Sequence, residues 1–253
     1  MNLLYIVPPV FFVISTIFSM LGMGGGQLYI PVLFWLGLDF KTEAIPLGLF
    51  LNMVNSGSSA FTYAREKLIN WRVGIPFGIT MLLFAPLGTW TNIKLPTKPV
   101  IVMFALFTAS AGILMLSGWK PKKRPSKKAA LVIGLSGGSF LGFLTGLIGR
   151  GGGSFVVPLL YMLGLEPKIA AATSSMVVNF SATSAFISHL ATAAHPQWPT
   201  WIACIIAVFL GSRVGSHLMA RRLKSKAIKY IFGWVLIGVA VILILQTFVM
   251  KIK

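Results

Sequence analysis

The chain has 253 residues, of which 56% are hydrophobic and 10% charged, and its mean hydropathy is +0.86. This composition excludes an ordinary soluble globular domain and predicts a protein that crosses a bilayer several times. The formal net charge is +18, but the 22 Lys and Arg residues stand mostly in short segments between apolar runs. That distribution indicates membrane topology, so we expect the lipid bilayer and no nucleic acid as a partner.

Apolar runs follow one another along the whole chain. Two of them, 27–38 and 154–165, have only about 12 residues, or about 18 Å of helix against a hydrocarbon core of ~30 Å. The other eight are long enough to span, and they cover residues 3–21, 44–64, 73–93, 100–117, 129–149, 169–192, 198–218 and 227–249. We therefore expect an all-α polytopic integral membrane protein that contains two short half-helices.

Each short run follows three consecutive glycines. Because a glycine inside a helix costs about 1 kcal/mol relative to alanine, these triplets indicate a place that needs bare backbone. A shift of 127 residues superposes the triplets and aligns Asn52 with Asn179 and Trp71 with Trp198, which indicates an internal duplication. The triplets are Gly24-Gly25-Gly26, before Gln27 and Pro31, and Gly151-Gly152-Gly153, before Ser154 and Pro158.

Each copy contains five apolar runs, and an odd number of crossings makes the second copy enter the membrane from the opposite face. The sequence therefore predicts two inverted-topology repeats. The first covers residues 1–118 and the second 129–253, and the basic segment 119–128 links them on the cytoplasmic side.

The charges of the loops assign the two faces. Five basic residues fall in one class of loops, namely Lys41, Lys94, Lys98, Lys251 and Lys253. Fifteen fall in the other, namely Arg65, Lys67, Arg72, Lys120, Lys122, Lys123, Arg124, Lys127, Lys128, Lys168, Arg221, Arg222, Lys224, Lys226 and Lys229. By the positive-inside rule the larger class is cytoplasmic, so we expect a multi-pass protein of the inner (cytoplasmic) membrane with both termini outside.

The two half-helices predict an anion site. Their lengths place both N-terminal ends near mid-depth in the bilayer, where free N–H groups and the positive ends of two helix dipoles favour an anion. Arg150, directly before the second triplet, adds an intramembrane cation suited to a sulfonate or carboxylate. The alternative is that the glycines only allow helices to cross closely, as the four-residue spacing of Gly134, Gly138, Gly142 and Gly146 indicates for run 129–149.

Polar side chains are dense in runs 44–64 and 169–192, where Asn52 and Asn179 occupy matching positions. Uncharged donors could line an anion path without trapping the anion, although serine and threonine often bond only to their own helix. The candidate substrate-binding residues are therefore Gly24, Gly25, Gly26, Gln27, Asn52, Arg150, Gly151, Gly152, Gly153, Ser154, Thr173, Ser174 and Asn179.

Catalytic and metal-binding motifs are missing from the sequence: it has no Ser-His-Asp, HExxH, CxxC or Walker pattern. Its four acidic residues, Asp39, Glu43, Glu66 and Glu166, all fall in loops. We expect no enzyme activity, no cofactor and no metal. Whether a proton or sodium ion is coupled to transport stays open, as does homo-oligomer formation.

The duplicated GGG-x4-P motif resembles that of the TauE/SafE sulfite exporter family, also called the toluene sulfonate uptake permease family. Further similarity lies in Ala172-Thr173-Ser174, in His189, and in the segment Leu210-Gly211-Ser212-Arg213 before a basic loop. The first copy departs from this pattern, since Pro46-Leu47-Gly48 replaces the small-Thr-Ser sequence. The resemblance implies transport of sulfite, sulfonates or related organosulfur or carboxylate anions, usually as export.

From these observations we expect a secondary transporter that moves a small anion by alternating access. Two alternatives stay open: an anion channel of the same architecture, and a non-transporting membrane scaffold or insertase that holds polypeptide.

Overall fold

The computed structural model describes residues 3–92, 97–119, 127–148, 153–190 and 198–249. Regular structure in these ranges is helical throughout, with no strand, which confirms the all-helical prediction. The helices are α1 (Leu3–Leu21), α2 (Gly26–Trp35), α3 (Ile45–Arg65), α4 (Trp71–Asn92), α5 (Thr97–Leu116), α6 (Lys127–Ile148), α7 (Gly153–Met162), α8 (Pro167–His189), α9 (Trp198–Arg222) and α10 (Ser225–Val249), and a π-helical turn, Phe40–Ala44, precedes α3.

Two of the described helices are much shorter than the rest. α2 and α7 have 10 residues each, whereas the other α-helices have 19 to 25. Both short helices therefore extend only about 15 Å, half of the hydrocarbon core. They follow the glycine triplets, as predicted from the sequence.

The short helices end in the same way, at Gly37 after α2 and at Gly164 after α7. These glycines have φ values of +93° and +84°, in the left-handed region that a residue with a Cβ atom adopts at a cost. In each case the glycine N–H and the N–H that follows donate to carbonyls of the last helical turn over 2.9–3.2 Å. This glycine-terminated cap stops each helix three residues before the end of its apolar run.

The chain between α1 and α2 also depends on glycine conformation. Gly22, Gly24 and Gly25 have φ values of +70°, +86° and +122°, which turn the backbone back on itself after α1. The first turn of α2 then forms with Gly25 as acceptor, because the N–H groups of Leu28 and Tyr29 both donate to its carbonyl over 3.0 Å. The triplet thus breaks one helix and starts another.

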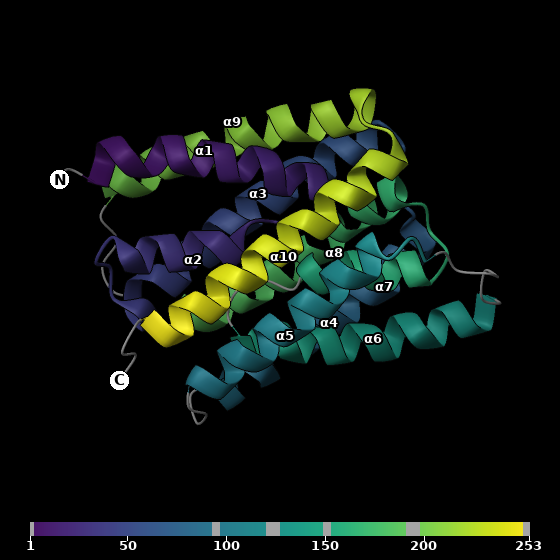
Figure 1. Cartoon of the computed structure of the whole chain (residues 1–253), viewed down its shortest axis with the longest axis horizontal. Helices are drawn as coiled ribbons and strands as arrows, with labels where there is room; N and C mark the ends of the chain where they lie inside the picture. The colour runs from purple at the N-terminus through teal and green to yellow at the C-terminus, as the bar shows by residue number, and fades with distance from the viewer. Residues whose placement is uncertain (1–2, 93–96, 120–126, 149–152, 191–197, 250–253) are drawn as a thin grey trace.

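Figure 1 shows that α1, α3, α5 and α9 run in one direction along the bundle, and α4, α6, α8 and α10 in the other. α2 and α7 start in the middle and run towards opposite ends. The most extensive packing joins α4 with α6, α1 with α9, α5 with α10, α4 with α8, and α3 with α8. α1 begins and α10 ends at the same end of the molecule (Figure 1).

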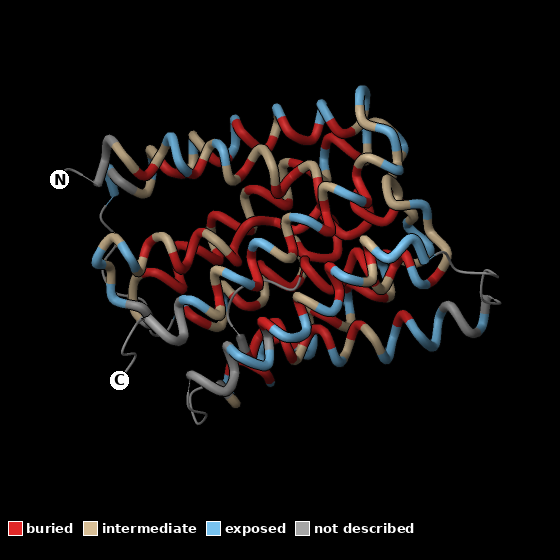
Figure 2. Tube along the Cα trace, viewed as in Figure 1, coloured by how far each residue is buried: buried red, intermediate tan, exposed pale blue. Residues whose placement is uncertain are grey.

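Helices α3 and α8 form the buried centre. Figure 2 shows that the buried residues gather in the middle of the bundle, around these helices and the starts of α2 and α7. Much of the polar content of α3 and α8 is buried, including Asn52, Asn55, Thr173 and Ser174. The outer helices instead bury one side and expose large apolar residues such as Leu83 and Trp234 on the other.

The exposed apolar surface fits contact with lipid rather than water. In the described residues, three helical segments are both long and apolar enough to cross a membrane: Trp71–Thr91, Trp201–Arg222 and Ser225–Leu245. α1, α5 and α6 contain shorter apolar segments, and asparagine, serine and threonine interrupt the apolar residues of α3 and α8. The protein is therefore membrane-embedded, and its most polar helices lie at its centre.

Three connections that carry basic residues, α3–α4, α7–α8 and α9–α10, meet at the end of the bundle opposite to the start of α1 (Figure 1). Arg221 at the end of α9 forms an ion pair with Glu66 after α3, with Nη2 and Oε1 3.0 Å apart. Lys168 at the start of α8 donates to the carbonyls of Ala220 and Leu223 over 2.7 and 3.3 Å. We call this the basic end.

Candidate functional site

α2 and α7 start beside each other in the buried centre of the protein. Gln27, the second residue of α2, donates from Nε2 to Oγ of Ser154, the second residue of α7. Both side chains are fully buried. The two residues are 127 positions apart, the same shift that superposes the glycine triplets. We call the place formed by Gly24–Gln27 and Gly153–Ser154 the α2/α7 junction.

Glycine at position 153 lets the two chain segments approach closely. A Cβ atom there would lie 2.2 Å from the carbonyl oxygen of Met23 and 2.4 Å from its Cα atom. Both are backbone atoms, so no side-chain rotation would relieve the overlap. At this position the sequence therefore needs bare backbone.

The first triplet packs against two asparagines of α3. Asn52 Oδ1 accepts a hydrogen bond from the Gly26 N–H over 3.4 Å, and Asn55 Nδ2 donates to the Gly24 carbonyl. A Cβ atom on Gly24 would lie 1.9 Å from Asn52 Oδ1. Asn52 and Asn55 are three residues apart on one helix face, so both amides point at the same backbone turn.

Two fully buried polar atoms at the junction have no hydrogen-bond partner among the described residues: Gln27 Oε1 and Asn52 Nδ2. Leaving a buried polar atom unpaired costs about 1–3 kcal/mol, so such atoms are rare in folded proteins. The junction thus presents one acceptor and one donor that have no partner among the described residues. A ligand or water with both donor and acceptor capacity fits this requirement.

Asn55 also joins the junction to α1 and α9, which sequence reasoning did not include in the site. Its Nδ2 donates to the Tyr29 hydroxyl over 3.1 Å, its Oδ1 accepts from Ser15 over 3.3 Å, and its carbonyl accepts from Ser212 over 2.8 Å. The three-residue spacing from Asn52 was the available signal for this residue. Asn55 thus positions the backbone around the first triplet.

Thr173 and Ser174 are fully buried near the start of α8. Ser174 Oγ donates to the Gly22 carbonyl over 2.8 Å, and Thr173 Oγ1 accepts from the Asn70 N–H over 3.0 Å. Ser174 therefore holds the break after α1, and Thr173 holds the connection that leads into α4. Through these contacts the two side chains hold backbone segments near the junction in place.

Asn179 connects the two central helices. Its Nδ2 donates to the Met53 carbonyl over 2.9 Å and to Ser56 Oγ over 3.3 Å, both on α3. Although Asn52 and Asn179 match in the duplicated sequence, their described contacts differ: Asn52 faces the first triplet and Asn179 bridges α8 to α3.

Three of the predicted site residues, Arg150, Gly151 and Gly152, lie outside the described residues. Arg213 of α9 contacts α3: its Nη1 donates to Thr62 Oγ1 over 3.3 Å, and its guanidinium lies 5.5 Å from the ring centre of Phe61. Over the described ranges, no three His, Cys, Asp or Glu side chains gather in a group that could hold a metal ion.

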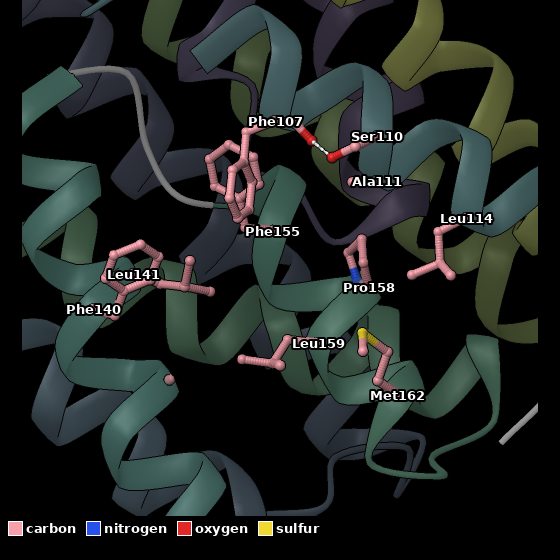
Figure 3. A pocket seen from close by; sticks show the side chains of 11 residues that line it. Phe107, Ser110, Ala111, Leu114, Phe140, Leu141, Phe155, Pro158, Leu159 and Met162 are labelled. Carbon is pink, nitrogen blue, oxygen red and sulfur yellow. Dashed lines mark hydrogen bonds between the residues drawn. The ribbon is translucent and has the colours of Figure 1, made fainter. Parts of the chain in front are cut away.

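An apolar cavity of about 320 Å³ lies beside α7, between α5 and α6. Figure 3 shows that Phe107, Leu141, Phe155 and Met162 face it, and the rings of Phe107 and Phe155 meet edge to face with centres 5.0 Å apart. The Ser110 hydroxyl is turned to the carbonyl of Phe107, 2.8 Å away (Figure 3). This lining has almost no polar groups that could bind an anion, so we do not include the cavity in the candidate anion site.

A helical bundle with an apolar exterior, a polar buried centre and two short helices that start there defines the class: a polytopic integral membrane protein with the features of a transporter. The family model for the sulfite exporter TauE/SafE matches residues 7–243. The chain belongs to this family of membrane transporters.

Individual relatives agree with this assignment. The chain is 26% identical to "Probable membrane transporter protein YunE" of Bacillus subtilis over 251 residues, which cover 88% of this chain and 90% of the relative. It is 30% identical over 185 residues to a "Probable membrane transporter protein" of Methanocaldococcus jannaschii, and the match covers 71% of this chain and 69% of the relative. A shorter match, 33% over 102 residues, joins 39% of this chain to 23% of "Sulfite exporter TauE/SafE family protein 5" of Arabidopsis thaliana.

Proposed function

We propose that this protein is a secondary transporter that moves small anions across the cytoplasmic membrane by alternating access, in the direction of export. The observation that carries the proposal is the α2/α7 junction, where Gln27 and Ser154 join the N-terminal ends of two helices in the buried centre. Transporters of inverted-repeat design bind substrate at such broken helices near mid-depth.

The packing of the helices supports the inverted repeat. If α1–α5 correspond to α6–α10, an approximate two-fold axis relates the two repeats. This axis superposes the packed pair α1 and α9 on the packed pair α6 and α4. The α3–α8 and α5–α10 pairs then map onto themselves. All four pairs are among those in most extensive contact, and α4–α8 and its counterpart α9–α3 pack extensively as well. Corresponding long helices also run in opposite directions in Figure 1. We assign the repeats to 1–118 and 129–253, with a linker at 119–128.

The junction suits an anion for electrostatic reasons. Each helix N-terminus carries about half of a positive elementary charge and presents N–H groups without an intrahelical acceptor. Asn52 Nδ2 adds a buried donor that lacks a described partner. The two ends of the Gln27 amide can exchange roles, with Oε1 accepting from the Ser154 hydroxyl and Nε2 left as a second donor for the anion.

Arg150 would supply the counter-charge, because its position in the sequence is one residue before the second triplet. Its planar guanidinium matches the two oxygen atoms of a sulfonate or carboxylate. We propose Gly24–Gly26 and Gly151–Gly153 as backbone contacts of the anion, and Asn179, Thr173 and Ser174 as residues that line or position the path.

The name of the family and of its plant member supports sulfite, sulfonates and related organosulfur or carboxylate anions as the substrate class. The basic end supports the orientation, since Arg65, Lys168 and Arg221 belong to the basic class of loops that favours the cytoplasm. Both termini then face outwards.

Transport by purified protein in liposomes tests this function. Labelled sulfite or a labelled sulfonate should enter with saturation, and an internal load of unlabelled anion should accelerate the exchange. Arg150→Ala should reduce the rate at least about tenfold, because it removes one charge-assisted hydrogen bond to the anion. Arg222→Ala, at an exposed position at the end of α9, is the matched control and should leave the rate unchanged.

The same assay separates the alternatives. Flux that rises linearly with concentration and shows no exchange would favour a channel. No flux of any tested anion, with the protein correctly folded, would favour a scaffold or insertase.

A further inference from the structure

A second cavity, of about 600 Å³, lies at the basic end, well away from the α2/α7 junction in the fold. It is formed where α5 and α7 end and where α8 and α10 begin. Its lining includes Tyr161, Glu166, Ser225, Lys226, Lys229 and Tyr230.

Lys229 is the unusual member of this lining, because it is only 7% exposed. Its Nζ atom donates to the carbonyl of Trp119 over 2.9 Å and to the Tyr161 hydroxyl over 3.1 Å. The ammonium group also makes a cation–π contact with the Tyr161 ring, with 4.8 Å from Nζ to the ring centre. These contacts use two of the three N–H bonds and supply no negative charge.

A buried ammonium is ordinarily paired with an anion. Among the described residues, the ion pair found is that of Arg221 with Glu66, and no carboxylate lies within 4.0 Å of Lys229. Glu166 lines the same cavity without forming such a pair. Lys229 therefore has no negatively charged partner among the described residues.

The surroundings indicate what would neutralise it. Lys226, one turn earlier on α10, also lines the cavity, and the first turn of α10 adds its N–H groups through Ser225. Two lysines and one glutamate give the lining a net formal charge of +1, which suits a singly charged group better than a polyanion. Tyr161 and Tyr230 are the kind of aromatic residue found at the membrane–water interface.

We propose that this cavity binds a singly charged phosphate group, held by Lys229 and Lys226. The group can come from the phosphodiester of an anionic phospholipid or from inorganic phosphate in its singly charged dihydrogen form, and the chemistry of recognition is shared. Occupation would tie α10 to the ends of α5 and α7 at the basic end. This inference does not depend on the transported substrate.

The test measures the thermal unfolding midpoint of the purified full-length protein in a neutral detergent. Two probes are titrated, dihexanoyl phosphatidylglycerol and inorganic phosphate, and hexyl glucoside serves as an uncharged control. We expect a saturable rise in the midpoint with at least one phosphate probe and none with hexyl glucoside. A response to the lipid alone identifies a headgroup site, and a response to both identifies a site for soluble phosphate as well.

Variants then decide whether the response comes from this cavity. Lys229→Gln keeps a donor for the Trp119 carbonyl but removes the charge, and it should raise the concentration for half-maximal response at least tenfold. Lys226→Gln lies at an exposed position and leaves the contacts of Lys229 with Trp119 and Tyr161 intact. It should raise the half-maximal concentration severalfold, and it replaces Lys229→Gln as the test if that variant fails to fold. Lys224→Gln, exposed and outside the lining, should behave as wild type. No response of the wild type, or the same response in the wild type and in Lys226→Gln, overturns the proposal.

Discussion

Gln27 and Ser154 occupy the same position in the two halves of the duplicated sequence, and in the structure their side chains are joined by a hydrogen bond. The contact lies where α2 and α7 begin, so it brings the ends of two helix dipoles together in a fully buried place. Like ends of two dipoles repel each other in an apolar medium, and an anion between them would remove the repulsion. The site proposed for the transported anion follows from this relationship.

The charge of the junction can be changed at Asn52 with little change in shape. Asn52→Asp keeps an oxygen for the Gly26 N–H but replaces the unpartnered donor Nδ2 by a second, negatively charged oxygen. We expect anion uptake in liposomes to fall at least about tenfold, because a buried carboxylate repels the substrate. Ser216→Ala is the control: Ser216 is equally buried but bonds only within α9, and its loss should leave uptake unchanged. Full uptake by a folded Asn52→Asp variant would contradict the role of Asn52.

Gly153 tests the close approach of the two chain segments. Gly153→Ala would place a methyl group 2.2 Å from the Met23 carbonyl oxygen, and we expect the free energy of unfolding to fall by about 1–3 kcal/mol. Gly134→Ala on α6 is the matched control, because a Cβ atom there meets nothing within 4 Å. It should be neutral or slightly stabilising. Thermal unfolding in detergent measures both, and equal stability of the two variants would argue against the close packing at the junction.

Asn179 should matter for stability because it bridges the two central helices. Asn179→Ala removes hydrogen bonds to the Met53 carbonyl and to Ser56, and interhelical bonds of this kind contribute about 0.6–1.7 kcal/mol each. We expect a lower unfolding midpoint, measured in the same detergent. Thr183→Ala, one turn further along α8, removes only a bond to its own helix and should shift the midpoint less. If Thr183→Ala lowered the unfolding midpoint more than Asn179→Ala, the stabilising role assigned to the Asn179 bridge would be wrong.

Lys67, just after α3, has a positive φ of 55° without being a glycine. This conformation costs a residue with a Cβ atom roughly 1–2 kcal/mol, and the position is the usual one for glycine at the end of a helix. Lys67→Gly should therefore raise the free energy of unfolding by up to about 1 kcal/mol, after allowance for the greater freedom of glycine in the unfolded chain. The contrary result, a lower unfolding midpoint, would mean that the lysine side chain contributes more than its backbone costs.

Much of this architecture could be predicted from the sequence, because the relevant signals are local. The glycine triplets and the short apolar runs after them predicted α2 and α7, and loop charge predicted that Arg65, Lys168 and Arg221 share one end. The structure places α2 and α7 as short helices, and contacts of Glu66 and Lys168 with the end of α9 place these connections together.

The contacts between helices were harder to predict, because helix rotation depends on the shapes of all the neighbouring side chains. The matching of Asn52 with Asn179 predicted equivalent roles, yet Asn179 bonds to the backbone of α3 while Asn52 faces the first triplet. The contacts of Asn55 with other helices were missed for the same reason. Its partners Ser15 and Ser212 come from α1 and α9, at sequence distances that no local pattern reveals.

Anion binding at the junction can be measured directly with purified protein. A thermal-shift screen of sulfite, sulfonates and carboxylates identifies the best ligand, and its dissociation constant is then compared between the wild type, the double variant Gln27→Ala/Ser154→Ala and the exposed control Arg222→Ala. We predict saturable binding to the wild type and the control, and a dissociation constant at least about tenfold higher for the double variant. Equal affinity of all three proteins, or no binding to the wild type, would contradict the central claim that the α2/α7 junction holds the transported anion.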